Sequence, residues 1–481
     1  MIGLFAGLLF KTFGIRHWTS KQVIAEGWQK FDTNDLKGAA ADFSRVIRRY
    51  PSNSAAYVGL ARVERKQGNF DAAILDFNRA IEINPDDVYA HVGFGIAKYD
   101  RGDYAGATLE LTRAIELNPT NSLAYYYRGN AHYYQGDMGA AAGDFITVIR
   151  LNPKDASAND YLGLICMKQT NYDAALGYFN RAVRLDPQSF DYIEDRAIVK
   201  AKMKDWDAAI EDYSQAVSLN PTNATAYFNR GLAKEQKADL DGAIADYSQS
   251  IKFDPKHERA LYNRALARRE KNDLVGAIAD YDQVIALNPK HFRAYDNRGY
   301  AQEKLGDFAG AIASYSKSVE LNATNYRPYL NRSMAEIKQG NLDAALKDAT
   351  RSIELNPTNS TVYNGRGWVE FLKSDFPAAI ADANRSIQLN PTYGNAYGTR
   401  GWARYGSGDA TGAIEDCKTA ISLMKPDSVG VGCDQRMIAY INGDYAKALA
   451  AWEDVLKKEP SLKSELQPWI EKARAKLPAG P

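Results

Sequence analysis

The chain has few of the residues that usually carry chemistry. Its 481 residues include five histidines and three cysteines, and no second histidine stands at metal-ligand spacing from a first. Three cysteines are too few for a disulfide framework, which favours a reducing, cytoplasmic compartment. The sequence contains no HExxH motif, no Walker loop and no glycine fingerprint between a strand and a helix. We therefore predict a protein that is not an enzyme, with no catalytic residues, no metal and no cofactor.

The chain also has no marked excess of positive or negative charge. The 60 lysines and arginines balance 59 aspartates and glutamates, for a net charge of +1, and the two signs are interspersed. A surface that follows a phosphate backbone needs a block or stripe of basic residues. Because no such block stands out, the sequence disfavours nucleic acid as a partner.

An apolar run opens the chain as MIGLFAGLLF. These ten residues are about half of what a membrane-spanning helix requires. On a helical wheel Leu4 and Leu8 could form an apolar face beside Lys11, as in a helix lying on a membrane. Residues 1–19 therefore have three interpretations: a cap on the first repeat, a helix that docks to a partner or peripherally to a membrane through residues 1–18, or a cleaved signal, whose usual flanks are not clear.

What the chain does have is a repeat of 34 residues. Ala224–His257 and Glu258–His291 carry the same tyrosine, Asn-Arg pair, small residues and proline at the same offsets. Ala323 takes the place of one proline in a series that otherwise stays on this frame: Pro51, Pro85, Pro119, Pro153, Pro187, Pro221, Pro255, Pro289, Pro357 and Pro391. A period of this length indicates a solenoid of stacked units that needs no single central core.

Each repeat is predicted to form two antiparallel helices, roughly Ala226–Gln236 and Leu240–Phe253 in the seventh copy. Glycine followed by Asn or Asp, as in Gly306-Asp307, ends the first helix and begins the second. Position 8 is small in at least nine copies, and position 20 is alanine in every copy, which gives the two helices the clearance to pack closely. Position 24 is aromatic in most repeats.

These offsets, together with proline at position 32, resemble the tetratricopeptide repeat (TPR) family over residues 20–460. The resemblance implies an all-α fold, a right-handed superhelical solenoid of about 13 helix-turn-helix repeats, followed at residues 461–481 by a capping helix and tail. It also implies a non-catalytic scaffold that binds an extended peptide or partner protein in its concave groove. The alternative function is a membrane-associated assembly factor docked through the N-terminal segment.

Arginine at position 7 and aspartate at position 23 form a ladder along the chain. The fifth repeat has lost both, with Leu162 and Tyr178 in their places, and Ser314 replaces the aspartate opposite Arg298. Their joint loss suggests that the two residues pair between the helices of a repeat. We predict structural ion pairs, rather than a ligand site, which include Arg230 with Asp246, Arg264 with Asp280, and Arg332 with Asp348.

A second ladder consists of Asn229, Asn263, Asn297 and Asn331, at position 6 of four consecutive repeats. In the TPR family the first helix lines the groove. This run is similar to the superhelix of O-linked N-acetylglucosamine transferases, whose inner asparagines hold peptide backbone. An amide both donates and accepts, so a row of amides can hold an extended chain without reading its sequence. A helix-surface asparagine inherited with the repeat is the other interpretation, and the sequence leaves both open.

Two aromatic clusters occupy positions that face the groove in the TPR family. Other repeats place polar residues there, such as Asp160 and Glu303, which indicates exposure. We predict that these aromatic residues bind a peptide or protein, since Tyr and Trp are frequent at binding hot spots; core packing is the alternative. The predicted residues are Tyr126, Tyr133 and Tyr134, with Tyr89 and Tyr99, in the first cluster, and Trp368, Phe371, Trp402 and Tyr405 in the second. A chaperone-type carboxylate clamp is not supported, because Tyr161 stands where the family requires asparagine.

Overall fold

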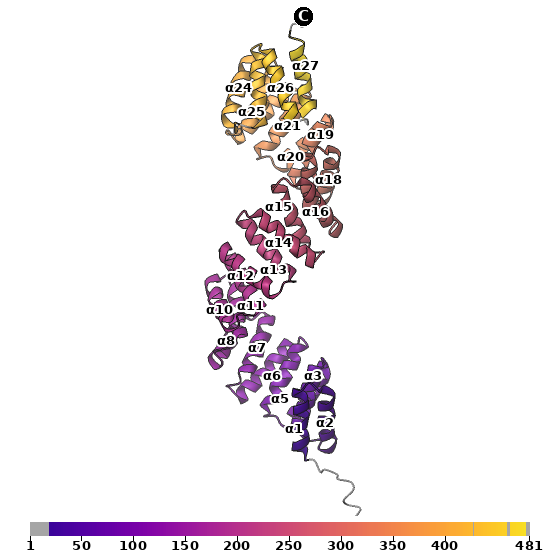
Figure 1. Ribbon diagram of the computed structural model, residues 1–481, viewed down its shortest axis with the longest axis vertical. Coiled ribbons are helices and arrows are strands. Elements are labelled where there is room, and N and C mark those ends of the chain that lie inside the picture. Colours follow the sequence, from indigo (N-terminus) through magenta and orange to yellow (C-terminus); the bar gives the residue numbers. More distant parts are fainter. Residues whose placement is uncertain (1–18, 427, 459–461, 478–481) are drawn as a thin grey trace, which may run out of the picture. The chain divides into compact units, whose positions relative to one another are not determined.

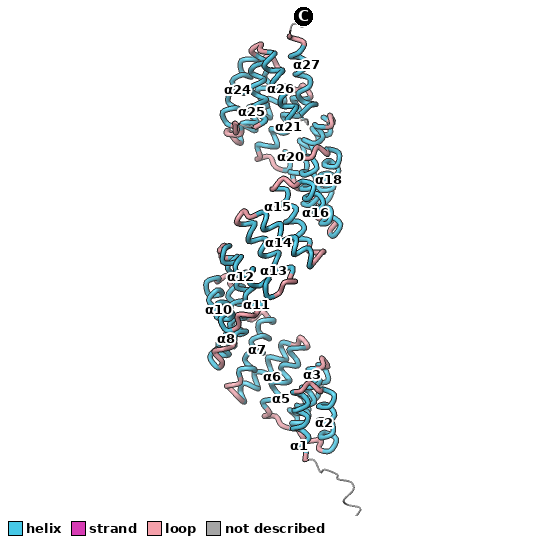
Figure 2. The backbone as a smooth tube through the Cα atoms, in the orientation of Figure 1, coloured by secondary structure: helices cyan, strands magenta, loops and turns pink. Residues whose placement is uncertain are grey.

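The computed structural model describes residues 19–426, 428–458 and 462–477. The regular elements in these ranges are helices joined by short loops, which confirms the all-α solenoid predicted from the sequence (Figure 2). The chain divides into two compact units, Met1–Pro221 and Thr222–Pro481. The predicted cap, docking helix or signal at residues 1–18 lies outside the described residues, so those three interpretations stay predictions.

Within the described residues, the first unit contains six helix pairs (Figure 1). Their bounds are α1 (Ser20–Asp32), α2 (Leu36–Arg49), α3 (Ser54–Lys66), α4 (Phe70–Ile83), α5 (Val88–Asp100), α6 (Tyr104–Leu117), α7 (Ser122–Gln135), α8 (Met138–Leu151), α9 (Ala156–Lys168), α10 (Tyr172–Leu185), α11 (Phe190–Lys202) and α12 (Trp206–Leu219).

The described part of the second unit contains seven pairs and one further helix. Their bounds are α13 (Ala224–Gln236), α14 (Leu240–Phe253), α15 (Glu258–Glu270), α16 (Leu274–Leu287), α17 (Phe292–Lys304), α18 (Phe308–Leu321), α19 (Tyr326–Lys338), α20 (Leu342–Leu355), α21 (Ser360–Leu372), α22 (Phe376–Leu389), α23 (Gly394–Gly406), α24 (Ala410–Leu423), α25 (Val429–Ile441), α26 (Tyr445–Lys458) and α27 (Lys463–Arg474).

The repeated small residues allow the two helices of a pair to approach closely. A Cβ atom added to Gly231 on α13 would lie 2.7 Å from Cε1 of Tyr247 on α14, so a larger residue would displace the ring. The alanine at position 20 is fully buried in every pair: Ala39, Ala73, Ala107, Ala141, Ala175, Ala209, Ala243, Ala277, Ala311, Ala345, Ala379, Ala413 and Ala448.

The turn inside each pair uses one residue in the left-handed region, as predicted. Gly306 has φ of +82°, and the side chain of Asp307 then accepts a hydrogen bond from the backbone nitrogen of Gly310 at 2.9 Å to cap α18. Where the sequence lacks this glycine, a side-chain-bearing residue adopts the same conformation, for example Ala238 with φ of 59°. The repeat geometry therefore outweighs a local strain of roughly 1–2 kcal/mol.

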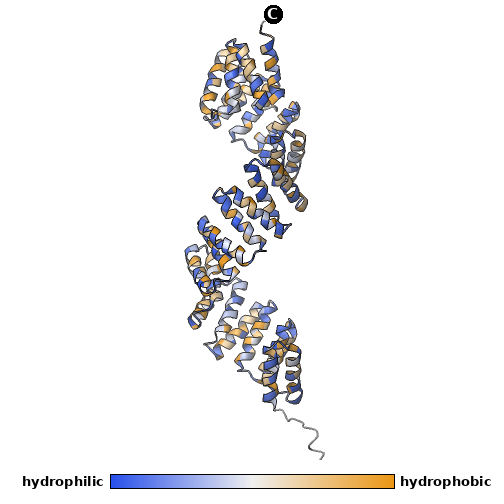
Figure 3. Cartoon of the chain, viewed as in Figure 1, coloured by the Kyte–Doolittle hydropathy of each residue, from blue (hydrophilic) through white to orange (hydrophobic). Residues whose placement is uncertain are grey.

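The first helices of successive repeats pack directly on one another. In the first unit α1, α3, α5 and α7 are in contact in that order, and in the second unit α19, α21, α23 and α25 are. We call the surface made by the first helices, those with odd numbers up to α25, the A-helix face. Apolar and polar residues alternate around the helices (Figure 3). None of the described helices combines the length and apolarity needed to cross a bilayer.

Candidate binding surfaces on the A-helix face

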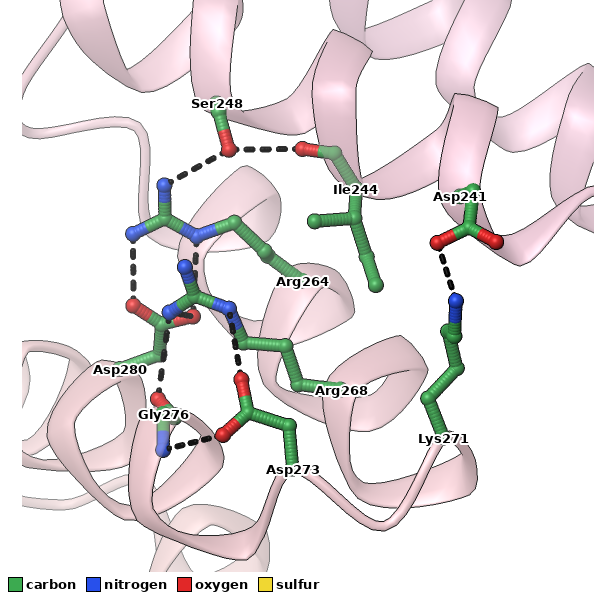
Figure 4. A network of polar contacts seen from close by, with 9 residues as sticks. All are labelled: Asp241, Ile244, Ser248, Arg264, Arg268, Lys271, Asp273, Gly276 and Asp280. Carbon is green, nitrogen blue, oxygen red and sulfur yellow. Dashed lines mark hydrogen bonds and ion pairs between the residues drawn. The ribbon is translucent and has the colours of Figure 1, made fainter.

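The arginines of the first ladder reach across their repeats to the aspartates. Arg264 donates from Nε and Nη2 to the two carboxylate oxygens of Asp280 at 2.9 and 2.6 Å, and Arg268 donates from Nη1 at 2.8 Å (Figure 4). The Asp280 side chain is only 1% exposed. The same two-bond geometry joins Arg128 to Asp144, Arg196 to Asp212, Arg230 to Asp246, Arg332 to Asp348, Arg366 to Asp382 and Arg400 to Asp416.

The repeat that lacks the aspartate uses two substitute acceptors. Arg298 donates from Nε to Ser314 Oγ on α18 at 3.0 Å, and from Nη1 at 2.6 Å to Asp282 on α16 of the preceding repeat. Ser314 Oγ in turn donates to Gln302 at 2.7 Å. The guanidinium is thus held in place even where the sequence breaks the ladder.

The asparagine ladder is partly buried, and Asn297 bonds neighbouring side chains. Asn297 donates from Nδ2 to the Tyr262 hydroxyl at 2.9 Å and accepts from Arg269 at 2.6 Å. Asn263 and Asn331 are half-buried. Asn229, the fourth member, is likewise half-buried. The bonds of Asn297 tie α17 to α15, so a role of the ladder in holding peptide backbone stays a prediction.

The first aromatic cluster forms a continuous tyrosine surface on α5 to α9. We apply this name to Tyr99, Tyr104, Tyr126, Tyr133, Tyr134 and Tyr161. Tyr134 stacks on Tyr104 with a centroid distance of 5.3 Å, and Tyr133 meets Tyr161 at 5.5 Å. Tyr134 is 53% exposed, and Tyr89 on α5 is 75% exposed. The rings are therefore held in place by one another, but part of the surface is open.

A group of carboxylates borders this surface on α9 and α11. We call Asp160, Asp191, Glu194 and Asp195 the acidic patch. Asp160 is 8% exposed, and its Oδ1 has no hydrogen-bond partner. The Ser157 hydroxyl lies 2.8 Å from that of Tyr192, which joins α9 to α11. Asp160 directly precedes Tyr161 on α9, so the patch adjoins the tyrosine surface.

The acidic patch carries carboxyl groups that are unusually reluctant to ionise. Burial, followed by the charges of Asp195 and Asp191, raises the pKa of Asp160 to about 8. Burial, followed by the charges of Glu194 and Asp191, raises the pKa of Asp195 to about 7. Among the described residues no cation opposes either shift, in contrast to the arginine-paired aspartates of the ladder. The raised pKa values thus have two causes, burial and the like charges of the neighbouring carboxyl groups.

The second aromatic cluster is covered by α27. The sequence predicted an exposed cluster, and for Phe371 and Trp402 that is wrong: they are 6% and 3% exposed. The cause is Trp469 of α27, whose ring lies 5.3 Å from that of Trp402 and 5.8 Å from that of Tyr405. The helix predicted as an end cap thus lies on the A-helix face, because its apolar side is complementary to these rings.

Two carboxylates that the sequence did not single out bind the tryptophans of this cluster. Trp368 Nε1 donates to Glu465 of α27 at 3.0 Å, and Trp402 Nε1 donates to Asp434 of α25 at 3.0 Å. Burial raises the pKa of Asp434 to about 7. An aspartate in place of the repeat's usual residues in α25 was the available signal, but only the fold places it beside an indole.

Family models with the description tetratricopeptide repeat or TPR repeat match most of the chain between residues 24 and 394. The matched ranges are 24–88, 128–190 and 330–394 for one model, 95–136, 199–237 and 265–306 for a second, and 224–257 and 292–325 for a third. The chain belongs to the tetratricopeptide repeat family. TPR repeats are generally non-catalytic scaffolds for protein–protein interaction.

Several solved structures are similar to this TPR chain at low sequence identity. A TPR protein from Parabacteroides merdae is 23% identical, and the match covers 53% of this chain and 99% of the P. merdae chain, with a TM-score of 0.43. The APC/C hetero-tetramer Cut9-Hcn1 is 15% identical over 94% of this chain and 96% of its own, with a TM-score of 0.40. YrrB, titled a TPR protein with an unusual peptide-binding site, is 23% identical over 39% of this chain and 97% of its own, with a TM-score of 0.36. No curated protein matches the sequence.

The described part of this TPR protein contains no metal-binding cluster, and its three cysteines form no disulfide. In residues 19–426, 428–458 and 462–477, no three His, Cys, Asp or Glu side chains are placed to hold a metal ion. Cys166, Cys417 and Cys433 are free, and burial raises the pKa of the Cys417 and Cys433 thiols. Cys417 Sγ donates to the Asp434 carboxylate at 3.8 Å, a contact within the core.

The Asp160→Asn substitution is expected to remove a pH-dependent loss of stability. An unfolded aspartate has a pKa of about 3.9, so between about pH 4 and pH 8 the folded TPR chain binds more protons at Asp160 and becomes less stable as pH rises. At pH 8 the variant should exceed the wild type in free energy of unfolding by on the order of a few kcal/mol, and near pH 4 the two should agree. Denaturant titrations across this range make the measurement, and parallel pH profiles would contradict it.

Proposed function

We propose that this TPR chain is a non-catalytic scaffold that binds a partner polypeptide along the A-helix face of α5 to α11. One observation carries the proposal: an open tyrosine surface borders carboxylates that no cation of the repeat neutralises. Aromatic side chains offer large contact area with few torsions to freeze, which is why they recur at hot spots. In the TPR family this face is the concave groove.

The chemistry of the surface favours a partner segment with basic side chains. Asp160 lies buried with an unpartnered oxygen, and a lysine or arginine placed there would satisfy it and lower its pKa. The neighbouring rings accept cations as well, because Lys168 Nζ lies 3.9 Å from the centroid of Tyr133. A segment that alternates basic with apolar residues matches both features. The asparagine ladder lies in the second unit, and its role in holding peptide backbone is a separate prediction from the sequence.

Synthetic peptides test the proposal directly. A fluorescein-labelled peptide that alternates arginine with leucine should bind the full chain, and a matched peptide with glutamate in place of arginine should not. Tyr133→Ala/Tyr134→Ala and Asp160→Asn should each weaken binding of the basic peptide about ten-fold or more, as loss of a hot spot does. Fluorescence anisotropy at fixed salt provides the affinities.

Matched controls separate recognition from general effects of charge or folding. Asp173→Asn removes an exposed carboxylate from α10, and Tyr50→Ala removes a tyrosine that is exposed at the end of α2; both should bind as the wild type does. For Asp160→Asn the proposal predicts two opposite effects: the free energy of unfolding should rise, and the affinity for the basic peptide should fall. Equal affinity for the basic and acidic peptides, or equal loss in Asp173→Asn, would contradict it.

A further inference from the structure

The C-terminal helix α27 contacts far more of the second unit than an end cap requires. A cap would cover the last pair, α25 and α26. Instead α27 extends contacts to Lys338 on α19, 127 residues before its partner Glu465, as well as to Trp368 on α21 and Trp402 on α23. The helix therefore lies across four consecutive first helices.

The A-helix face offers α27 one socket for a carboxylate. Glu465 accepts from Lys338 Nζ and from Trp368 Nε1, the latter at 3.0 Å, and its side chain is buried. A charge-assisted bond from lysine and a bond from an indole N–H satisfy both oxygens. Burying a carboxylate is costly unless hydrogen-bond donors such as these satisfy its oxygens. The socket therefore favours an acidic side chain in any helix that binds there.

Next to this socket the same face forms a pocket for an indole. Trp469 follows Glu465 by four residues, one helical turn, and so projects from the same side of α27. Its ring lies 6.4 Å from that of Phe371, in a stacked arrangement, and 5.8 Å from that of Tyr440. Carboxylate socket and indole pocket together recognise two side chains at helical spacing.

The groove does not match α27 closely. A cavity of about 670 Å³ between Phe376, Tyr405 and Pro468 lies along the helix, and a second of about 260 Å³ lies between Trp368, Asp434 and Leu462. Pro468 stands inside α27, where it removes a backbone hydrogen bond. A helix of 12 residues is marginal by itself. A continuous helix with larger side chains would fill more of this space.

We propose that the A-helix face of α19 to α25 is a binding groove for an amphipathic partner helix that presents a carboxylate and, four residues later, a tryptophan. The segment α27 occupies the groove in cis and is exchanged for that partner. This site is separate from the tyrosine surface in residues, in unit and in ligand chemistry. The covered state is the one that the structure shows, with Phe371 and Trp402 buried beneath α27.

The exchange is measured with a peptide of this chain's own residues 462–477, labelled with fluorescein. The full chain carrying Glu465→Ala/Trp469→Ala keeps the groove and weakens its cis occupant. This variant should bind the peptide on the order of 100-fold more tightly than the wild-type chain, in which α27 competes at roughly millimolar effective concentration. Adding Trp368→Ala to the variant should remove binding, and a peptide carrying Glu465→Ala/Trp469→Ala should not bind.

If the double variant folds poorly, a milder variant and a peptide without the internal proline still test the proposal. Glu465→Gln removes only the charge that Lys338 contacts, and it should give an intermediate gain in peptide affinity. A peptide with Pro468→Ala should bind more tightly than the native peptide. Equal peptide affinity for wild type and both variants would overturn the proposal. A mixed dimer of wild type and double variant in light scattering would assign the groove to a second copy and overturn it too.

Discussion

The Asp280→Ala variant is expected to lose about 3–5 kcal/mol of unfolding free energy, the usual result of removing one partner of a buried ion pair. Asp280 accepts from both Arg264 and Arg268, at 2.6 to 2.9 Å, and is nearly inaccessible to water. Removing this carboxylate leaves the guanidinium groups of Arg264 and Arg268 without their shared acceptor (Figure 4). Chemical denaturation gives the total effect, and hydrogen exchange in α15 and α16 shows whether it is local, as expected for a solenoid.

A matched carboxylate on the same helix provides the control for this experiment. Asp282 pairs with Arg298, but its side chain is 53% exposed. Removing an exposed partner typically costs at most about 1 kcal/mol. Similar losses from Asp282→Ala and Asp280→Ala would show that burial of the ladder does not determine its contribution. No loss from Asp280→Ala would contradict the structural role predicted for these pairs.

The Trp469→Ala variant is expected to lose about 3–5 kcal/mol from the C-terminal repeats, as large-to-small changes of buried aromatic residues do. Trp469 and its neighbours Trp402 and Phe371 are 3% to 8% exposed, and the Trp469 ring also contacts Tyr405 and Tyr440. Protection against hydrogen exchange should fall in α27 and in the facing α21 and α23. The first unit should keep its protection, because repeats stabilise mainly their neighbours.

Glu471→Ala tests whether this effect depends on the buried side of α27. Glu471 lies on the same helix, two residues further on, and is exposed. Its substitution should change stability by less than about 0.5 kcal/mol. If Trp469→Ala were equally mild, the helix would contribute little to the second unit, and the burial of Phe371 and Trp402 would need another cause.

Much of the candidate site followed from residue patterns alone. Joint loss of arginine and aspartate in the fifth repeat predicted the ladder, because residues that pair tend to be kept or lost together. The helix predicted at Leu240–Phe253 has those bounds in the structure, and the preceding one begins at Ala224, two residues earlier than predicted, because Asn223 caps it. The bond of Asn297 to Tyr262 was not predicted, since position 6 alone does not show which side chains reach it.

The acidic patch shows which property of the surface the sequence pattern could not predict. In the sequence, Asp160 indicates only that its position is polar. Its importance depends on burial, and on the absence of a nearby cation among the described residues, neither of which has a period in the sequence. Electrostatic environment is a property of the packed repeats, so the raised pKa of Asp160 could be found only after the helices were placed.

The sequence by itself determined the TPR family, the helix pairs and the ladder, because these depend on contacts within a repeat or between neighbouring repeats, which recur every 34 residues. Only the tertiary structure decided which aromatic cluster is open. Tyr134 and Trp402 come from equally suggestive positions, yet the first is exposed and the second lies under α27. The reason is physical: α27 binds surfaces up to 127 residues away through one carboxylate and one indole, and a contact made once leaves no periodic signal in the chain.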